Sequence, residues 1–321
     1  MKIKISVAIL VLVAVNLTFF GIKYIQIERN IEKYVDSSAS ENKSDTDNNE
    51  LSLSQKPKEL NPSNNLIEQS KNLPESMPIA IVTTPSIEIK GRIAIIIDDV
   101  GTKTFRYFLM DQIPYQLNLA VIPGFKDSKE LVKQFADNKK YELLLHMPME
   151  PRIKNGDQES HDLNTLKYQY MIRDGQDDKS IRKELTDALN SLDGLGIIRG
   201  LNNHMGSSVT SSQNMMESVM KWADKNKMYF VDSMTTAKSV AYEVAKKKKL
   251  KTAYNEVFLD GTDTPEYIRK SLEKLQNLAI KNGVAVAIGH IQRQHTLEVL
   301  FAEMPKMAAA GIKFVFVSEI L

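Results

Sequence analysis

Residues 93–99 read Ile-Ala-Ile-Ile-Ile-Asp-Asp, a short β-branched run that ends in two carboxylates. Similar short apolar runs recur downstream and alternate with longer stretches whose apolar residues have helical spacing. The runs are Ile93–Ile97, Leu117–Ile122, Glu142–Leu145, Gly196–Leu201, Met228–Val231, Val257–Leu259, Val284–Ile288 and Lys313–Val317. Strands that alternate with helices predict βαβ units and a parallel sheet. About seven to eight such units favour an α/β fold, built as an irregular or incomplete (β/α) barrel.

The composition excludes several classes of protein. The chain has 321 residues, 42% of them apolar, and a formal net charge of +2, which argues against a dedicated nucleic-acid binder. It has no cysteine, so disulfide scaffolds, thiolate zinc sites and cysteine nucleophiles are excluded. No Gly-x-Gly-x-x-Gly follows a predicted strand and no Walker-type loop is present, so dinucleotide and P-loop functions lose support. Five histidines remain for histidine chemistry: His146, His161, His204, His290 and His295.

The sequence of residues 1–90 predicts a membrane anchor followed by a linker. Ile5–Ile22 form an apolar run of 18 residues behind a short basic head, just long enough to cross a bilayer. The run does not end in a small-x-small cleavage site, so an uncleaved transmembrane helix within residues 1–34 is favoured over a signal peptide. Residues 35–90 are polar and carry several prolines, which predicts a disordered linker. Residues 91–321 form the predicted barrel domain.

Polar residues end six of the predicted strands. Because the carboxyl ends of parallel strands meet at one face of a barrel, we expect their side chains to converge there. Each residue alone has an ordinary alternative, since an aspartate after a strand is often a helix N-cap. The coincidence of six strand ends predicts a functional site. The residues are Asp98, Asp99, His146, Asn202, Asn203, His204, Asp232, Asp260 and His290.

This set of side chains suits metal-assisted hydrolysis. Two histidines and one aspartate are a plausible three-ligand set for Zn²⁺ that leaves a position open for water. A carboxylate beside the metal can serve as a base, and a further group can protonate the leaving atom. At a strand end, Asp98 and Asp99 can divide metal binding and proton transfer between them. His161 and His295 lie in polar loops and are expected to be surface residues.

Six motifs follow one another in the barrel region. They are Ile-Asp98-Asp99-Val-Gly, Leu-Leu-His146-Met-Pro-Met-Glu150, Asn202-Asn203-His204-Met205-Gly206-Ser207, Phe230-Val-Asp232-Ser233-x-Thr235, Val-Phe-Leu259-Asp260 and Ala-Ile-Gly289-His290. This series resembles the divergent polysaccharide deacetylase family of bacterial envelope proteins (YibQ type), over essentially Gly91 to Leu321. That family is related to the NodB-type polysaccharide deacetylases, which are metal-dependent carbohydrate esterases with an irregular (β/α) barrel.

The resemblance implies a role for most of these residues. Asp98 matches the catalytic base, Asp99 the first metal ligand and His290 the general acid. The two other ligands of the wider superfamily come from a His-x-x-x-His motif, which here begins at His146 but ends in Glu150.

The third ligand is therefore either Glu150 or His204. We prefer His204, because zinc favours imidazole and the residue ends the next strand. The usual Arg-x-Pro-Tyr motif is absent, so a metal alone would have to stabilise the oxyanion. The remaining polar residues are assigned to substrate binding: Glu150, Asn202, Asn203, Asp232 and Asp260.

The resemblance thus implies a membrane-tethered hydrolase that uses zinc or another divalent metal. It would remove acetyl groups from an envelope polysaccharide or a peptidoglycan-type glycan, with no nucleic-acid partner. The expected location is the bacterial inner membrane, with a single span and the barrel domain in the periplasm or otherwise outside the cytoplasm.

Two alternatives stay open at this point. The altered His-x-x-x-His motif and the missing Arg-x-Pro-Tyr motif are compatible with a weakly active or inactive envelope protein that binds glycans or regulates other proteins. A metallo-phosphoesterase with Mg²⁺ or Mn²⁺ would use the acidic residues, but oxygen-only ligation would leave His146 and His204 unexplained.

Overall fold

The computed structural model describes residues 88–152 and 168–321. The predicted membrane anchor and all but the last three residues of the predicted linker lie outside these ranges. Among the described residues, no helix is long and apolar enough to cross a membrane. The division into anchor, linker and barrel domain stays a prediction.

The described chain is built on one parallel sheet. Its strands follow the order β6-β5-β4-β3-β2-β1-β8-β7, and β9 pairs with β1 beside this path. Every pair of strands is parallel, so the predicted α/β barrel of about seven to eight parallel strands is confirmed. The strands are β1 (Gly91–Val100), β2 (Leu117–Val121), β3 (Tyr141–Met149), β4 (Gly200–Met205), β5 (Tyr229–Asp232), β6 (Thr252–Tyr254), β7 (Val257–Phe258), β8 (Val284–His290) and β9 (Ile312–Phe314).

The barrel is incomplete between β6 and β7. These two strands form the ends of the sheet path, yet they follow each other directly in the chain. The Asn255 N–H donates to Asp232 O on one side of the gap, and the Glu256 N–H donates to Val286 O on the other. A two-residue link therefore spans the gap where a regular barrel would have a ladder of hydrogen bonds.

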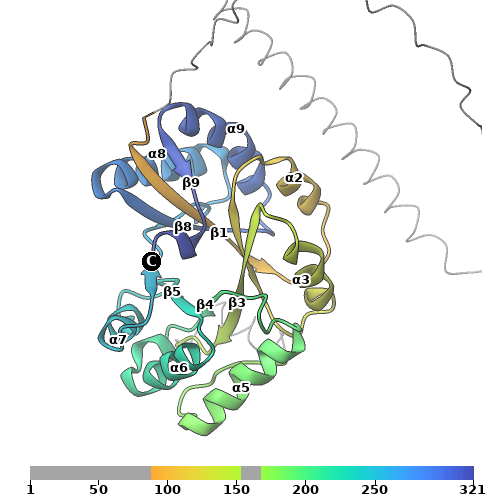
Figure 1. Ribbon diagram of the computed structural model, residues 1–321, viewed down its shortest axis with the longest axis vertical. Helices are drawn as coiled ribbons and strands as arrows, with labels where there is room; N and C mark the ends of the chain where they lie inside the picture. The colour runs from red at the N-terminus through yellow and green to blue at the C-terminus, as the bar shows by residue number, and fades with distance from the viewer. Residues whose placement is uncertain (1–87, 153–167) are drawn as a thin grey trace, which may run out of the picture. The chain divides into compact units, whose positions relative to one another are not determined.

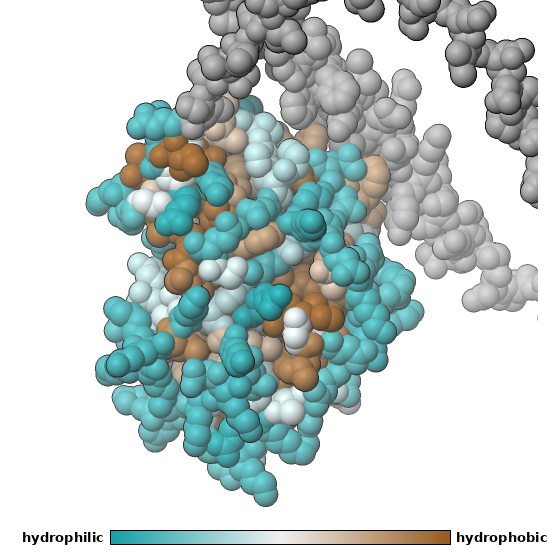
Figure 2. All heavy atoms as spheres, in the orientation of Figure 1, coloured by the Kyte–Doolittle hydropathy of each residue, from teal (hydrophilic) through white to brown (hydrophobic). Residues whose placement is uncertain are grey.

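Helices surround the sheet on its outer side (Figure 1). Helices α8 and α9 lie beside β1, β8 and β9, and α5 and α6 lie beside β3 to β5. On the face that Figure 2 shows, hydrophilic residues predominate, and apolar residues are visible in patches between them. The helices are α2 (Arg106–Gln112), α3 (Ser128–Ala136), α5 (Asp178–Ser191), α6 (Gln213–Lys225), α7 (Ala241–Lys247), α8 (Pro265–Asn282) and α9 (Thr296–Ala309), with short 3-10 turns at Val209–Ser211 and Val317–Glu319.

Local sequence explains where the longest helix begins and ends. The Thr264 side chain caps α8 by accepting a hydrogen bond from the Tyr267 N–H, and Pro265 occupies the first helical position, where its missing N–H costs nothing. Gly283 ends the helix with φ of 82°, a left-handed conformation that glycine adopts easily.

The two faces of β1 pack against different partners. Ala94 and Ile96 belong to the cluster inside the barrel, which also takes in the carboxyl-terminal Val315 and Val317. The alternating residues of this strand, such as Ile95, have no exposed surface either. A strand buried on both faces reads as a continuous apolar run, which is why residues 93–97 contain no polar residue.

The carboxyl-terminal segment fills the end of the barrel where the strands begin. Asn118 accepts a hydrogen bond from the Val317 N–H at 2.9 Å. Glu142 accepts hydrogen bonds from the Tyr229 hydroxyl at 2.7 Å and the Ser318 N–H at 3.1 Å. The side chains of Asn118 and Glu142 therefore have hydrogen-bond partners. The candidate functional site lies at the opposite end of the barrel.

Several strand bounds differ from the expectation, and two of these differences concern the site. The strand predicted at Gly196–Leu201 begins at Gly200, and the strand predicted to stop at Leu145 continues to Met149. His146 and the Asn202–His204 stretch thus lie within strands and do not follow them. Their polar side chains are tolerated inside the barrel because they bind one another.

Candidate metal centre

A bulge at the end of β1 brings two successive carboxylates to the same site. Between Ile97 and Val100 the register of β1 against β2 shifts, and Asp99 has φ of 64°. In a regular strand the side chains of Asp98 and Asp99 would point to opposite faces, but a bulge removes that constraint. Both carboxylates lie near His146: Asp99 Oδ1 is 3.1 Å and Asp98 Oδ2 is 3.5 Å from its Nε2 atom.

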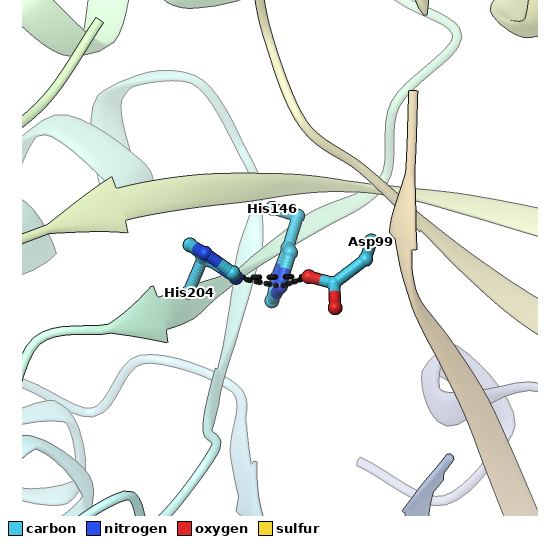
Figure 3. A group of neighbouring side chains, drawn as sticks. All are labelled: Asp99, His146 and His204. Carbon is cyan, nitrogen blue, oxygen red and sulfur yellow. Dashed lines mark hydrogen bonds and ion pairs between the residues drawn. The ribbon is translucent and has the colours of Figure 1, made fainter. Parts of the chain in front are cut away.

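Asp99 from β1, His146 from β3 and His204 from β4 converge at one site (Figure 3). Asp99 Oδ1 lies 3.1 Å from His146 Nε2 and 2.9 Å from His204 Nδ1. The two ring nitrogens are 3.1 Å apart. One carboxylate oxygen and two imidazole nitrogens thus form a compact triangle at the open end of the barrel.

This triangle fits a divalent metal of the zinc type. Zinc bound tetrahedrally at about 2.0–2.1 Å from each ligand atom needs ligand atoms about 3.3 Å apart, close to the separations observed. Two histidine nitrogens and one carboxylate oxygen are also ligands that zinc accepts. Without a cation, two imidazole nitrogens held 3.1 Å apart must share a proton or repel each other.

Neighbouring side chains hold each of the three groups in position. His146 Nδ1 lies 2.8 Å from Asn202 Oδ1, so the Nδ1–H donates there and Nε2 faces Asp99 in the triangle. His204 Nε2 lies 2.8 Å from the Tyr168 hydroxyl, which orients the ring so that Nδ1 faces Asp99 and His146 in the triangle. Gln292 donates a hydrogen bond to Asp99 Oδ2. Such partners fix the tautomer and orientation of metal ligands.

Asn202 links the triangle to Asp98. Its side chain has no exposed surface, and its Nδ2 donates to Asp98 Oδ1 at 2.8 Å and to Ser233 Oγ at 3.3 Å. The same amide binds His146 through its oxygen. The residue therefore orients two site side chains, and its predicted role in substrate binding stays a prediction.

The two aspartates are in different electrostatic states. Burial would raise the pKa of Asp99, but hydrogen bonds from His146 and His204 and their charges hold that pKa well below its usual range. Burial raises the pKa of Asp98, against the opposing charges of His146 and His290. Asp99 therefore stays ionised as a ligand should, whereas Asp98 is the better proton acceptor.

His290 lies beside Asp98 on the neighbouring strand. The register of β1 against β8 pairs the two residues directly. Asp260 binds His290 twice, by accepting from the backbone N–H at 2.7 Å and by contacting Nδ1 at 2.8 Å. Burial lowers the pKa of His290, but the hydrogen bond and charge of Asp260 outweigh it and raise that pKa to about 9. Thr296 also donates to Asp260, at 2.6 Å.

Glu150 lies apart from the metal triangle. Its carboxylate accepts a hydrogen bond from the Asp174 N–H at 2.7 Å, in the loop before α5. The three side chains that the structure brings together are Asp99, His146 and His204, which supports our preference for His204 over Glu150 as the third ligand.

Two further residues predicted from the sequence, Asn203 and Asp232, hydrogen-bond to the end of β4 and to the segment that follows β5. Asn203 accepts from the Ser233 N–H at 2.9 Å and donates to the carbonyl of Met205. Asp232 accepts from the Met234 N–H at 2.9 Å and from the Ser239 hydroxyl at 2.6 Å. Both are buried, and their predicted contacts with substrate stay predictions, as does that of Asp260.

Two pockets open beside the triangle. One has a volume of about 640 Å³ and the other about 240 Å³, and His204, Met205 and His290 line both. Asp99 faces the larger pocket, whereas Asp98 and His146 face the smaller one. A chain-like ligand could therefore extend to both sides of the candidate metal centre.

Residues 95–321 match a family described as divergent polysaccharide deacetylase. The match covers most of the chain and every residue of the candidate site. The chain belongs to this family, as the six motifs predicted.

Known relatives agree with this assignment. The chain is 30% identical over 211 residues to "Uncharacterized protein YibQ" of Escherichia coli (strain K12), a match that covers 66% of this chain and 62% of the relative. The match thus spans less than two thirds of the relative's length. An uncharacterized protein of Haemophilus influenzae is 28% identical over 220 residues, covering 66% of this chain and 71% of the relative.

A solved structure shows the same fold. It is that of uncharacterized protein ATU2773 from Agrobacterium tumefaciens C58, which is 22% identical in sequence. The two structures superpose with a TM-score of 0.62, over 72% of this chain and 89% of that one.

Proposed function

We propose that this protein is a metal-dependent hydrolase that removes acetyl groups from an envelope polysaccharide or a peptidoglycan-type glycan. One observation carries the proposal: a three-ligand triangle at the open end of the barrel is flanked by Asp98 and His290, paired on adjacent strands. A proton acceptor and a proton donor beside a metal centre are the parts that hydrolysis of an amide or ester needs.

Asp99, His146 and His204 would hold the metal, with zinc as our first choice. When bound there, a divalent cation supplies Lewis-acid chemistry, since it lowers the pKa of water and favours negative charge on an acyl oxygen. Asn202, Tyr168 and Gln292 hold the three ligands in the orientation that this chemistry requires.

The remaining steps belong to the chain's own residues. Asp98 accepts a proton from water as the water oxygen forms a bond to the acetyl carbon. His290, held as a cation by Asp260, gives a proton to the sugar nitrogen or oxygen as its bond to the acetyl carbon breaks. The products are a free amine or hydroxyl group and acetic acid, which ionises to acetate. Of the proton from acetic acid and the proton on Asp98, one restores the His290 cation and the other passes to solvent.

The location of the protein is part of the proposal. The apolar run at residues 5–22 and the polar segment at residues 35–90 favour a single inner-membrane span and a flexible tether. The barrel would then act outside the cytoplasm. Protease added to spheroplasts should cleave the tether and release the barrel; full protection of the chain in intact spheroplasts would contradict this location.

The catalytic proposal is tested by acetate release. Zinc-loaded full-length protein should release acetate from N-acetylglucosamine oligomers, from peptidoglycan or from an O-acetylated glycan. Asp98→Asn removes the base without changing its shape, and we expect kcat to fall about 10²–10⁴-fold. His295→Gln is the matched control, because His295 pairs with Glu298 and lines neither pocket beside the triangle.

Two results would overturn the proposal. The first is zinc-loaded protein that binds these glycans but releases no acetate, which would favour the glycan-binding alternative. The second is undiminished acetate release by Asp98→Asn, which would remove Asp98 from its assigned role.

A further inference from the structure

The larger of the two pockets is lined by two arginines that form no contact ion pair in the described chain, although the charge of Asp263 acts on Arg293. Arg106 and Arg293 both line it, from α2 and from the loop after β8. Neither guanidinium group takes part in an ion pair within residues 88–152 and 168–321. Two arginines elsewhere in the described chain do have partners: Arg182 pairs with Asp178, and Arg269 with Glu303.

Arg106 is unusual in a second respect. Its Nε atom is buried and, among the described residues, has no hydrogen-bond partner. Its guanidinium lies over the Phe105 ring, 5.1 Å from the centroid. A buried donor left unpaired is costly, and in native proteins such a group often indicates an absent ion or ligand.

The pocket has one carboxylate in its lining, and that carboxylate is already engaged. Asp99 binds His146 and His204 and accepts a hydrogen bond from Gln292. Asp99 therefore has little capacity left to neutralise the two arginines. His290, which Asp260 holds as a cation, adds positive charge to the same lining.

The same pocket lining includes two stacked aromatic rings. The rings of Phe125 and Tyr168 stack with centroids 5.8 Å apart and an interplanar angle of 11°. Both residues line the pocket, and Ile122 lies behind them in the same apolar cluster. Aromatic faces of this kind pack against the apolar faces of sugar rings.

We propose that this pocket is a subsite for an acidic sugar, whose carboxylate binds Arg106 and Arg293 while its ring packs against Phe125 and Tyr168. The inference rests on the proposed function, because it specifies the glycan as one that carries carboxylates next to the acetylated residue. Arginine suits this role, since its planar fork of donors matches a carboxylate.

Binding to metal-free full-length protein tests the subsite. Removal of the metal prevents a carboxylate from binding at Asp99, His146 and His204. The probes are tetragalacturonate, which is acidic, and chitotetraose, which is neutral, measured by calorimetry at low ionic strength. We expect tetragalacturonate to bind at least about tenfold more tightly.

Two variants and one control test which residues cause the preference for tetragalacturonate. Arg106→Gln and Arg293→Gln should each weaken tetragalacturonate binding about tenfold, the effect of one charged hydrogen-bonded contact. Arg173→Gln is the control, because Arg173 is exposed and lines neither pocket beside the triangle. Arg293 is itself exposed, so its substitution tests the subsite even if Arg106→Gln unfolds the protein.

Several outcomes would overturn the subsite. Equal affinity for the two probes would do so, as would unchanged binding of tetragalacturonate in Arg293→Gln. Binding of inorganic phosphate but not of tetragalacturonate would assign the arginines to a phosphate group instead. Conversely, arginine-dependent binding of tetragalacturonate without acetate release from any glycan would confirm the subsite and contradict only the hydrolase.

Discussion

Asp260 and His290 form a pair whose charge state depends on pH. The pKa of His290 is raised from 6.5 to about 9 in the metal-free protein by Asp260, which outweighs burial. A histidine with a raised folded-state pKa contributes stability that is fully present below about pH 6.5 and is lost as pH rises through about 9. His290 is therefore the cationic partner at neutral pH, as a proton donor must be.

We expect Asp260→Asn to lower the pKa of His290. The substitution keeps the side-chain shape but removes the charge that favours the imidazolium form. In an NMR titration of the metal-free protein, the His290 ring signals should shift with a midpoint at least about one unit below that of the wild type. Asp263→Asn should leave the midpoint unchanged, because Asp263 binds the backbone of Gln294 and His295. An unaltered midpoint in Asp260→Asn would refute the pairing.

Sequence patterns identify most of the site residues, because strand ends can be recognised from apolar runs that stop at polar residues. They do not identify Tyr168 or Gln292. Tyr168 lies between predicted elements and meets His204 across 36 positions of sequence. Gln292 reaches Asp99 only because the loop after β8 folds over the barrel opening. Contacts of this kind depend on loop conformation, which periodicity does not encode.

At the level of the element, the ends of the strands carry unusual backbone conformations. Asp99 near the end of β1, Met205 at the end of β4 and Met234 after β5 all have positive φ, between 54° and 64°. Left-handed conformations cost energy for residues with a side chain and tend to gather at functional sites. The sequence gives no signal for the two methionines, whereas aspartate is among the residues that adopt this conformation more readily.

Gly200 at the start of β4 is a testable case of close packing inside the barrel. A Cβ at this position would lie 2.2 Å from the Tyr229 ring. That ring is held by the hydrogen bond from its hydroxyl to Glu142, so it cannot move away freely. We expect Gly200→Ala to lower the free energy of unfolding by about 1–3 kcal/mol, measured by denaturant titration.

The matched control for this substitution is Gly261→Ala. There the nearest atom is the hydroxyl of Tyr267, at 2.9 Å, the far end of a side chain that is 40% exposed and free to shift. The change in stability should stay within about 0.5 kcal/mol. Equal effects of the two substitutions would show that close packing against Tyr229 is not the cause.

Element boundaries also show where sequence prediction fails. β4 begins four residues later than the predicted run at Gly196–Leu201, because Ile197 and Ile198 donate hydrogen bonds to the Gly194 carbonyl in a turn and do not pair with β3. The short strand β6 was not predicted, since Thr252–Tyr254 has neither alternation nor an apolar run.

For the whole molecule, the two ends of the barrel have separate tasks. The end where the strands begin is filled by the carboxyl-terminal segment. There the backbone N–H groups of Val317 and Ser318 donate hydrogen bonds to the side chains of Asn118 and Glu142. The other end carries the candidate metal centre and two pockets. This division follows from the parallel sheet. Because all strands point the same way, the carboxyl-terminal ends of the strands all lie at the end of the barrel that carries the site.

Removal of residues 317–321 should therefore destabilise the barrel while leaving the metal ligands in place. Buried Glu142 and Asn118 would lose hydrogen-bond partners, and the interior cluster would lose Val317. We expect a fall in the unfolding free energy of at least about 3 kcal/mol, read by thermal unfolding. Removal of Leu321 alone should have a smaller effect, since it only partly packs against the cluster. A truncated protein as stable as the full chain would contradict this role of the segment.

The central claim is that Asp99, His146 and His204 bind a metal, and metal analysis of the purified full-length protein tests it most directly. We predict about one zinc per chain, lost in His146→Ala and in His204→Ala but retained in the control His295→Ala. If zinc is absent even after it has been supplied, or if both site variants retain it, the metal centre and the hydrolase built on it are contradicted.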